Sequence, residues 1–230
     1  LQTKNYKLQT PKFGLRILNQ KSQIRNQKSQ IIMSYDKFTI LKSTAVPMPI
    51  ENVDTDQIIP ARFLKATERK GFGDNLFRDW RYNNDNSPKK DFVLNNPIYT
   101  GKILVGGKNF GSGSSREHAA WAIYDYGFRC VVSSFFADIF KNNSINVGIL
   151  PVQISEIFLD KIFTAIEANP QNELEINLPE QTITILSTGE KESFDINGYK
   201  KNNLTNGYDD IDYLQAMKAN IASFAATSIY

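Results

Sequence analysis

Short apolar runs recur along the chain after Met33, and polar residues, glycine or asparagine lie at their borders. Runs of this length with such borders are typical of buried β-strands rather than of helices. They cover residues 38–41, 103–105, 128–132 and 148–152. Residues 173–196 add a β-rich stretch in which Ile183 and Ile185 alternate with threonines.

Helical patterns lie between and after these runs. The apolar positions between residues 119 and 126 fall on one helix face, and Gly127 follows where a C-terminal cap belongs. Further helices are expected over residues 138–142, 155–169 and 208–226, with Ser155 as the cap of the second. Because strands and helices alternate, the sequence predicts an α/β fold.

Residues 67–91 interrupt this alternation. The segment is rich in arginine, lysine, asparagine and glycine, and it contains Phe72, Phe77, Trp80 and Tyr82. Loops of this length are usually either functional or disordered. The four aromatic residues favour a partly ordered loop that reaches over a ligand or a partner, and the alternative is a solvated insertion.

Composition narrows the class of protein. The chain has 230 residues, of which 41% are hydrophobic, and no apolar run approaches the length of roughly 18 residues that a membrane span needs. We therefore expect one soluble domain without a membrane partner. The single cysteine, Cys130, excludes an internal disulfide, and with the single histidine, His118, it cannot build a Cys/His metal cage. Any metal chemistry must be carried by another chain.

Residues 1–32 form a basic, low-complexity leader in which Asn-Gln-Lys-Ser-Gln occurs twice. The leader holds seven lysines and arginines and no acid, so the net charge of +3 becomes −4 without it. The remainder, residues 33–230, therefore gives no reason to expect nucleic-acid binding. The leader is either a targeting peptide or an over-extended start before Met33. We favour the second and expect a cytoplasmic protein, because the leader lacks the amphipathic, serine-rich pattern of organelle targeting.

The residues best suited to chemistry lie in a glycine- and serine-rich run between a strand and a helix. Ser114 and Glu117 match a capping box, which predicts that the helix begins at Ser114 with free backbone N–H groups that attract anions. Gly111 and Gly113 permit positive φ angles, and Arg116 offers a planar donor fork. Together these features suit a carboxylate ligand.

Other readings of the same run stay open. A phosphate-binding or dinucleotide loop is disfavoured because the glycine spacing and the following residues do not match. Ser114 alternatively serves only as a helix cap, and Arg116 only as a surface ion pair. His118 is more often a packing or hydrogen-bonding residue at such a position than a general base.

Three segments carry a resemblance to a known family. They read FGSGSSREHAAWAIYDYGFRCVVSSFFADIF from Phe110, NVDTDQIIPARFL at 52–64 and GFGDNLFRDWRY at 71–82. Together they resemble the small subunits of 3-isopropylmalate dehydratase, and GSSREHA is also similar to the mobile domain of aconitase. The resemblance implies a single swivelling β/β/α domain of the aconitase C-terminal domain type. It also implies a hydro-lyase of leucine biosynthesis, which isomerises 2-isopropylmalate and 3-isopropylmalate by dehydration and rehydration.

The resemblance also assigns roles to individual residues. Ser114 matches the serine that abstracts the substrate proton, and Ser115 and Arg116 match ligands of a substrate carboxylate. Asp56 matches an active-site aspartate. A further substrate arginine of aconitase has no clear counterpart, because Glu68 occupies the ungapped position and Arg69 lies beside it.

The resemblance further implies a partner and a cofactor. A large subunit would form a heterodimer or higher assembly with this chain and would hold a [4Fe-4S] cluster, so this chain alone would bind none. The substrate would be a small dicarboxylate, with Phe72 or Leu76 facing its apolar branch. Alternative functions are the small subunit of a hydro-lyase acting on citramalate, homoaconitate or dimethylmalate, and a non-catalytic carboxylate- or RNA-binding module.

Overall fold

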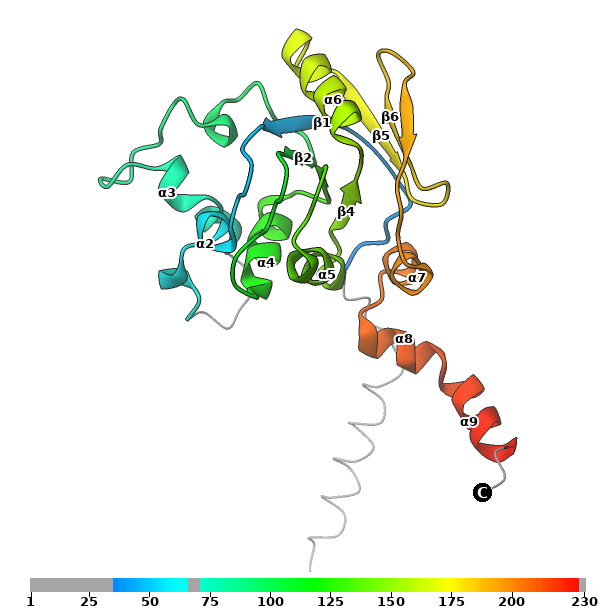
Figure 1. The fold of residues 1–230 in the computed structure, drawn as a ribbon. Helices are drawn as coiled ribbons and strands as arrows, with labels where there is room; N and C mark the ends of the chain where they lie inside the picture. Colours follow the sequence, from blue (N-terminus) through cyan, green and yellow to red (C-terminus); the bar gives the residue numbers. More distant parts are fainter. Residues whose placement is uncertain (1–34, 66–70, 228–230) are drawn as a thin grey trace, which may run out of the picture. The chain divides into compact units, whose positions relative to one another are not determined.

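A seven-stranded mixed sheet organises the chain, with the strand order β4-β3-β2-β1-β5-β6-β7 (Figure 1). The computed structural model describes residues 35–65 and 71–227. The strands are β1 (Ile40–Met48), β2 (Ile103–Gly106), β3 (Cys130–Ser133), β4 (Leu150–Gln153), β5 (Glu173–Asn177), β6 (Thr182–Ile185) and β7 (Lys191–Ser193). Strands β1 to β4 pair in parallel, whereas β5 pairs antiparallel with both β1 and β6, and β6 with β7. The predicted α/β class is confirmed.

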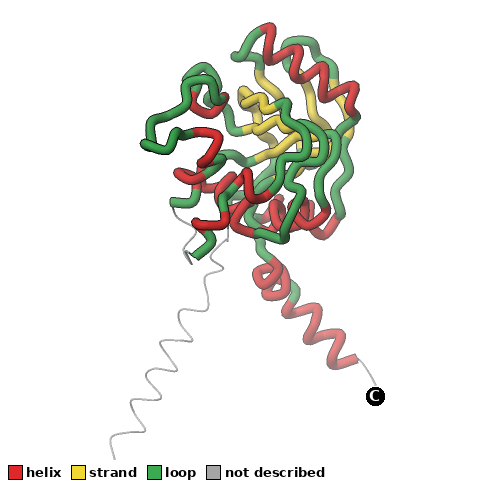
Figure 2. Tube along the Cα trace, turned by 60° about the vertical axis from the view of Figure 1, so that its left-hand side comes forward, coloured by secondary structure: helices red, strands yellow, loops and turns green. Residues whose placement is uncertain are grey.

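Helices cover both faces of the sheet. The helices of the described residues are α2 (Thr55–Ile58), α3 (Arg78–Arg81), α4 (Glu117–Tyr126), α5 (Asp138–Asn146), α6 (Glu156–Ala168), α7 (Gly198–Asn206), α8 (Asp210–Ala216) and α9 (Lys218–Thr227), of which α9 has no buried residue. Short 3-10 turns lie at Ala61–Phe63, Gly73–Asn75 and Val93–Asn95. In Figure 2 the strands, in yellow, lie among helical segments in red. Within the described ranges, no helix combines the length and apolarity of a membrane span.

The buried side chains of the parallel strands divide between two apolar clusters because successive residues of a strand face opposite sides of the sheet. Ile103 and Val105 of β2 join the cluster that includes the inner face of α6, whereas Leu104 joins the cluster built on α4. Both faces of the parallel strands are therefore covered. This explains why these strands read as continuous apolar runs rather than as alternating patterns.

Local sequence signals located some elements well and others poorly. Ser155 caps α6 as predicted, and its hydroxyl accepts a hydrogen bond from the Phe158 N–H at 3.1 Å. The single helix predicted over 208–226 is two helices, α8 and α9, because Met217 leaves the helical conformation with ψ of 1°. Helix α7, capped by Asn197, was not predicted. The leader, residues 1–32, and Arg69 lie outside the described residues.

The parallel strands place four connecting segments at one edge of the sheet. Because β1 to β4 run in the same direction, the residues that follow each strand share the carboxyl edge. These segments are residues 49–54, 107–116, 134–137 and 154–155. Ligands of open α/β sheets usually bind at this edge. The run with candidate chemistry, residues 107–116, follows β2 and therefore lies there.

Candidate functional site

The segment after β2 lies directly against the segment after β1. The N–H of Gly111 donates to the carbonyl of Val53 at 2.7 Å, and the N–H of Thr55 donates to the carbonyl of Ser112 at 2.8 Å. Asp54 and Ser112 form an isolated parallel bridge. Two stretches that are far apart in the sequence thus become one folded unit at the carboxyl edge.

Glycine is required where the loop turns. Gly111 and Gly113 have φ angles of +79° and +92°, as the sequence predicted. Residues that carry a Cβ atom rarely adopt this backbone conformation. A Cβ atom at Gly111 would also overlap the ring of Phe140. The loop therefore depends on Gly111 for both its backbone conformation and its packing.

The predicted capping box at Ser114 is wrong. Helix α4 begins at Glu117, and its N-cap residue is Arg116, which makes no side-chain capping hydrogen bond. The Ser114 carbonyl instead accepts hydrogen bonds from the Thr55 hydroxyl at 3.0 Å and from the Arg116 N–H at 2.8 Å. The second contact closes a tight turn over residues 114–116, and Arg116 itself is extended, with φ −109° and ψ 105°. Helical geometry is therefore delayed until Glu117.

This local geometry leaves the Ser114 side chain uncommitted. Ser114 and Ser115 are both exposed, and no described residue hydrogen-bonds to the Ser114 hydroxyl. Helix α4 begins at Glu117, three residues after Ser114. A helix end of this kind carries a positive partial charge, so it favours an anion nearby.

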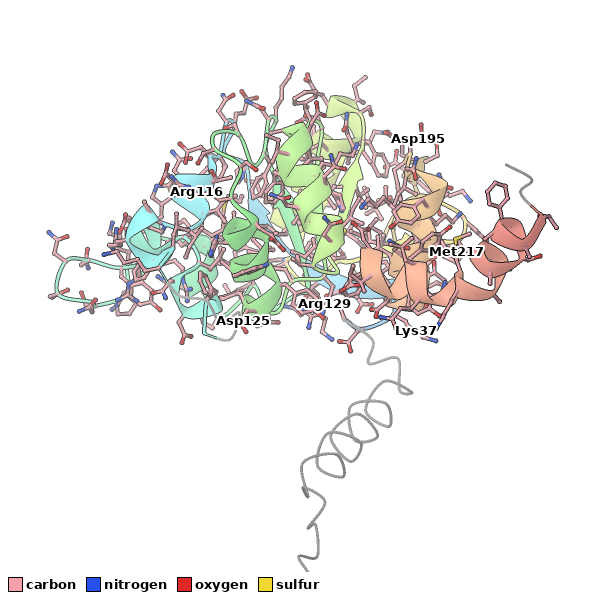
Figure 3. The ribbon with its side chains drawn as sticks, turned by 90° about the horizontal axis from the view of Figure 1, so that it is seen from below. Lys37, Arg116, Asp125, Arg129, Asp195 and Met217 are labelled. Atoms are coloured by element: carbon pink, nitrogen blue, oxygen red, sulfur yellow. The ribbon has the colours of Figure 1, made fainter. Side chains whose placement is uncertain are left out.

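Asp56 and Arg116 meet across the two segments. Asp56 lies on α2, and its carboxylate forms an ion pair with the Arg116 guanidinium. The side chain of Arg116 is 19% exposed and that of Asp56 is 55% exposed. Such a pair contributes little to stability. Its value is positional, since it holds the donor fork of Arg116 beside the Ser114 loop, next to α2 (Figure 3).

Two neighbours of these residues have structural roles. Asp54 caps α2 in a capping box with Gln57, so the first acid of Asp54-Thr-Asp56 is committed to the helix. His118 packs against Phe72 and Trp121, with ring centroids 5.5 Å and 4.5 Å away. The packing role expected for His118 agrees with these contacts.

The described part of the aromatic loop, residues 71–91, folds against α4. The N–H groups of Gly71 and Gly73 both donate to the Asp125 carboxylate at 2.9 Å. Arg81 is 8% exposed, and its guanidinium donates to the carbonyls of Gly73 and Leu76 at 3.3 and 3.2 Å. The order expected from the aromatic residues is thus present in this part of the loop.

The expectation that Phe72 or Leu76 faces a substrate branch is wrong for this subunit. Phe72 is 3% exposed and Leu76 is fully buried, and both belong to the cluster built on α4. Burial of these side chains stabilises the loop, so they have no surface left for a ligand. Sequence reasoning also missed Thr55, Arg81 and Asp125, because each acts through hydrogen bonds to backbone groups, which leave no pattern of residue types.

The donor set of the chain does not fit an iron–sulfur cluster. Cys130 is fully buried, and burial raises the pKa of its thiol well above the ordinary range, so the thiolate that binds metal is disfavoured. Among residues 35–65 and 71–227, no three His, Cys, Asp or Glu side chains form a metal-binding group. The described residues therefore offer no ligand set that suits such a cluster.

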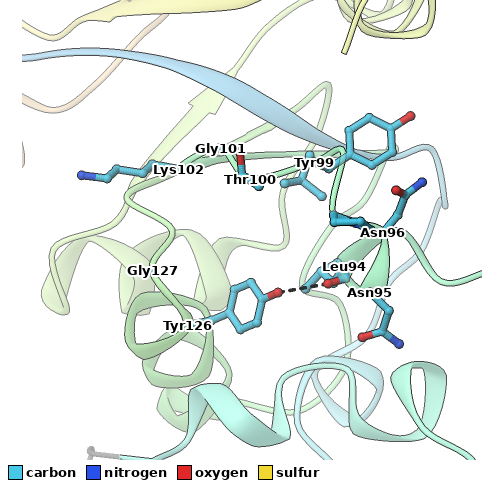
Figure 4. Close-up of a pocket in the computed structure, with 11 residues that line it drawn as sticks. Leu94, Asn95, Asn96, Tyr99, Thr100, Gly101, Lys102, Tyr126 and Gly127 are labelled. Atoms are coloured by element: carbon cyan, nitrogen blue, oxygen red, sulfur yellow. Dashed lines mark hydrogen bonds between the residues drawn. The ribbon is translucent and has the colours of Figure 1, made fainter. Parts of the chain in front are cut away.

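A pocket of about 440 Å³ lies away from the Ser114 loop. Its lining includes Leu94, Tyr99, Lys102 and Tyr126, and the Tyr126 hydroxyl donates to the Leu94 carbonyl at 3.2 Å (Figure 4). The lining contains no acid and none of the candidate site residues Asp56, Ser114, Ser115 and Arg116. We therefore base the site on the charged and polar groups of the Ser114 loop and not on the size of this pocket.

Comparisons with known proteins place the chain in a family. Residues 35–157 match the aconitase C-terminal domain, and residues 160–198 match the family model described as LeuD_N. A 3-isopropylmalate dehydratase small subunit of Cytophaga hutchinsonii is 64% identical over 195 residues, which are 85% of this chain and 97% of that protein. The corresponding protein of Christiangramia forsetii is 60% identical over 189 residues, or 82% and 92% of the two chains.

A solved structure supports the same assignment. The crystal structure of a 3-isopropylmalate dehydratase protein of Methanocaldococcus jannaschii matches with a TM-score of 0.60 and 28% identity. The match covers 80% of this chain and 98% of that chain. The chain therefore belongs to the family of 3-isopropylmalate dehydratase small subunits, which carry the aconitase C-terminal domain.

Proposed function

We propose that this chain provides the proton-transferring and carboxylate-binding side of a 3-isopropylmalate dehydratase, with Ser114 as the base. In this proposal Arg116 and Ser115 bind a carboxylate of the substrate, and Asp56 orients Arg116. Arg69, outside the described residues, is included on the resemblance alone. The enzyme is a hydro-lyase that acts with a large subunit. The cytoplasmic location stays a prediction.

The uncommitted hydroxyl of Ser114 is the observation that carries this proposal. The Ser114 backbone is held by Thr55 and Arg116, but its side chain is exposed and is not used as a helix cap. A serine hydroxyl is a weak base unless its alkoxide is stabilised. The start of α4 places the positive end of a helix dipole near the same loop, and the Arg116 guanidinium, which is paired with Asp56, adds hydrogen-bond donors there. The residue therefore has both the freedom and the surroundings that a base requires.

The reaction divides between proton transfer and binding. Ser114 Oγ takes a proton from the carbon next to the hydroxyl-bearing carbon, and hydroxide leaves to form the alkene. Water then adds in the opposite sense, so that no atoms are gained or lost overall. Arg116 stays on a substrate carboxylate throughout, because its planar fork matches the two carboxylate oxygens.

The iron–sulfur cluster is assigned to the large subunit. The single buried thiol of Cys130 does not fit a four-iron cluster, so no step of the chemistry in this chain runs through one. When held by the large subunit, the cluster would supply Lewis-acid chemistry to the hydroxyl group of the substrate. The partner and its cluster are inferred from family resemblance.

Reconstitution tests the proposal. The purified chain and the purified large subunit are assayed separately and together for interconversion of 2-isopropylmalate and 3-isopropylmalate. We expect turnover only from the pair, with a higher kcat/KM for isopropylmalate than for citramalate, homoaconitate or dimethylmalate. Turnover by this chain alone would contradict the proposed division of labour. A higher kcat/KM for another hydroxy acid would change the assigned substrate.

A further inference from the structure

Four large apolar side chains are exposed at the carboxyl edge. Ile50 follows β1, Phe135 follows β3, and Ile139 and Ile157 lie in the first turns of α5 and α6. Their exposed fractions are 42%, 47%, 49% and 74%. We propose that these four residues, here called the carboxyl-edge apolar surface, are a docking surface for the large subunit. This inference rests on the proposed function.

The segments that carry this surface touch one another. A Cβ atom on Gly107 would lie 2.5 Å from the Ile50 carbonyl oxygen, so the segments after β1 and β2 are in close contact. The Ser133 hydroxyl is 2.7 Å from the Gly107 carbonyl and 2.9 Å from that of Phe135. The segments that carry Ile50 and Phe135 therefore adjoin one another at this edge.

The same surface continues into the candidate site. The N–H of Phe110 donates to the Phe135 carbonyl at 3.0 Å, and Gly111 follows directly in the Ser114 loop. At the other side, Lys108 forms an ion pair with Glu156, next to Ile157. Apolar residues flanked by exposed charged pairs are the usual make-up of a specific protein interface.

The site itself selects the occupant. Ser114 and Ser115 are exposed at this edge, whereas the only thiol of the chain is buried on Cys130, so the rest of the catalytic centre must approach from outside. A large subunit that completes the site must cover the carboxyl edge, and it would then bury the adjoining apolar side chains. Removal of this apolar area from water favours association.

Another exposed apolar face is less suitable. Ile211 and Leu214 of α8 are 61% and 54% exposed. However, α8 follows α7, and α7 contacts the C-terminal end of α5. The Lys200 ammonium of α7 donates to the Asn146 side chain at 2.8 Å, and Asn146 is the last residue of α5. Ile139 lies at the opposite end of that helix. A partner seated on α8 would not cover the Ser114 loop.

Charge insertion tests the surface without damaging the fold. Ile157→Glu and Ile139→Glu each place a carboxylate at the second position of a helix, where negative charge is favourable. The matched control is Ile211→Glu, at the second position of α8. Each full-length variant is titrated with the purified large subunit by calorimetry, and its melting temperature is measured alone.

We expect the Kd for the large subunit to rise at least about tenfold with Ile157→Glu or Ile139→Glu, because each buries a charge in an apolar contact. The Kd of Ile211→Glu should stay within about twofold, and melting temperatures should remain near the unchanged chain. Equal Kd values for all three variants, or weakening by Ile211→Glu alone, would overturn the docking surface while leaving the proposed function standing. Failure of the unchanged chain to bind the large subunit would overturn both.

Self-association provides the remaining outcome. If sedimentation shows that the isolated chain forms dimers, and Ile157→Glu abolishes the dimers without changing large-subunit affinity, the surface is an interface between two copies. That result would also overturn the proposal. We expect no such dimer at the concentrations used for titration.

Discussion

Replacing Ser114 by alanine separates a catalytic role from a structural one, because the Ser114 hydroxyl makes no hydrogen bond among the described residues. The Ser114 carbonyl, which accepts from Thr55 and from the Arg116 N–H, is retained in Ser114→Ala. The lost atom is an exposed hydroxyl. Surface substitutions of this kind usually change stability by less than about 0.5 kcal/mol.

The expected catalytic effect is much larger. Acid–base groups typically contribute about 10² to 10⁴ in rate, which corresponds to roughly 2.7 to 5.5 kcal/mol of transition-state stabilisation. If Ser114 were a helix cap instead, alanine would cost about 1 kcal/mol of stability, or roughly 2 to 4 °C in melting temperature for a chain of this size. The two roles therefore predict opposite combinations of stability and activity.

The assay uses the reconstituted pair with the large subunit at a saturating concentration, and it measures kcat and KM for 2-isopropylmalate. The melting temperature of each small-subunit variant is measured separately. Ser112→Ala is the matched control, because its hydroxyl lies in the same loop and makes only a 3.4 Å contact to the Asn52 carbonyl. We expect near-normal kcat from the control. Ser114→Asn adds a second comparison, since asparagine is a good cap but not a base.

A near-normal kcat for Ser114→Asn, or for Ser114→Ala, would refute the assignment of Ser114 as the base. A fall in kcat that is accompanied by a lower melting temperature would instead point to misfolding of the loop. We expect neither, and we expect both variants to bind the large subunit as the unchanged chain does.

Three further predictions concern one hydrogen bond to the Ser114 loop and two buried side chains. Thr55→Val removes the hydroxyl that donates to the Ser114 carbonyl, so it should lower kcat by about tenfold with little change in KM. Thr55→Ser keeps the hydroxyl and should retain activity, and equal kcat values for the two variants would contradict a positioning role for Thr55. Leu76→Ala should lower the free energy of unfolding by about 2 to 5 kcal/mol in denaturant titration, since the side chain is fully buried; a loss under 1 kcal/mol would contradict its core position. Cys130 should resist thiol reagents at pH 8 until the chain is unfolded, because burial raises its pKa, and rapid labelling of the native chain would disagree with this burial.

Elements whose signals are complete within a short window were predictable from the sequence. Residues 103–105 are apolar because β2 is buried on both faces, and the prediction differs from the observed strand only at Gly106. Ser155 caps α6 through a contact three residues away. In both cases the local pattern and the tertiary environment favour the same structure, so the reading did not depend on distant residues.

The start of α4 was not predictable in the same way. Ser114 and Glu117 match a capping box locally, but Thr55, 59 residues earlier, donates to the Ser114 carbonyl, and Arg116 is extended. Leu76 was placed at a ligand for a similar reason, since its local sequence does not reveal that the loop folds against α4, where Asp125 accepts from the N–H groups of Gly71 and Gly73. Long-range hydrogen bonds to backbone groups leave no periodic trace in the sequence.

The correction at Ser114 strengthens the chemical argument rather than weakening it. The hydroxyl of a capping serine accepts a hydrogen bond from a backbone N–H. Here Thr55 instead donates to the Ser114 carbonyl, and the Ser114 hydroxyl is not used as a cap. In the isolated chain this hydroxyl faces water, where two unit charges about 4 Å apart interact by only about 1 kcal/mol; at an effective dielectric constant near 20 the same pair gives about 4 kcal/mol. A partner that covers the carboxyl edge and excludes water would therefore strengthen the stabilisation of a serine alkoxide by nearby positive groups. In the proposed function, docking would activate the base as well as supply the rest of the site, which gives a physical reason for the serine and the proposed docking surface to share one edge of the sheet.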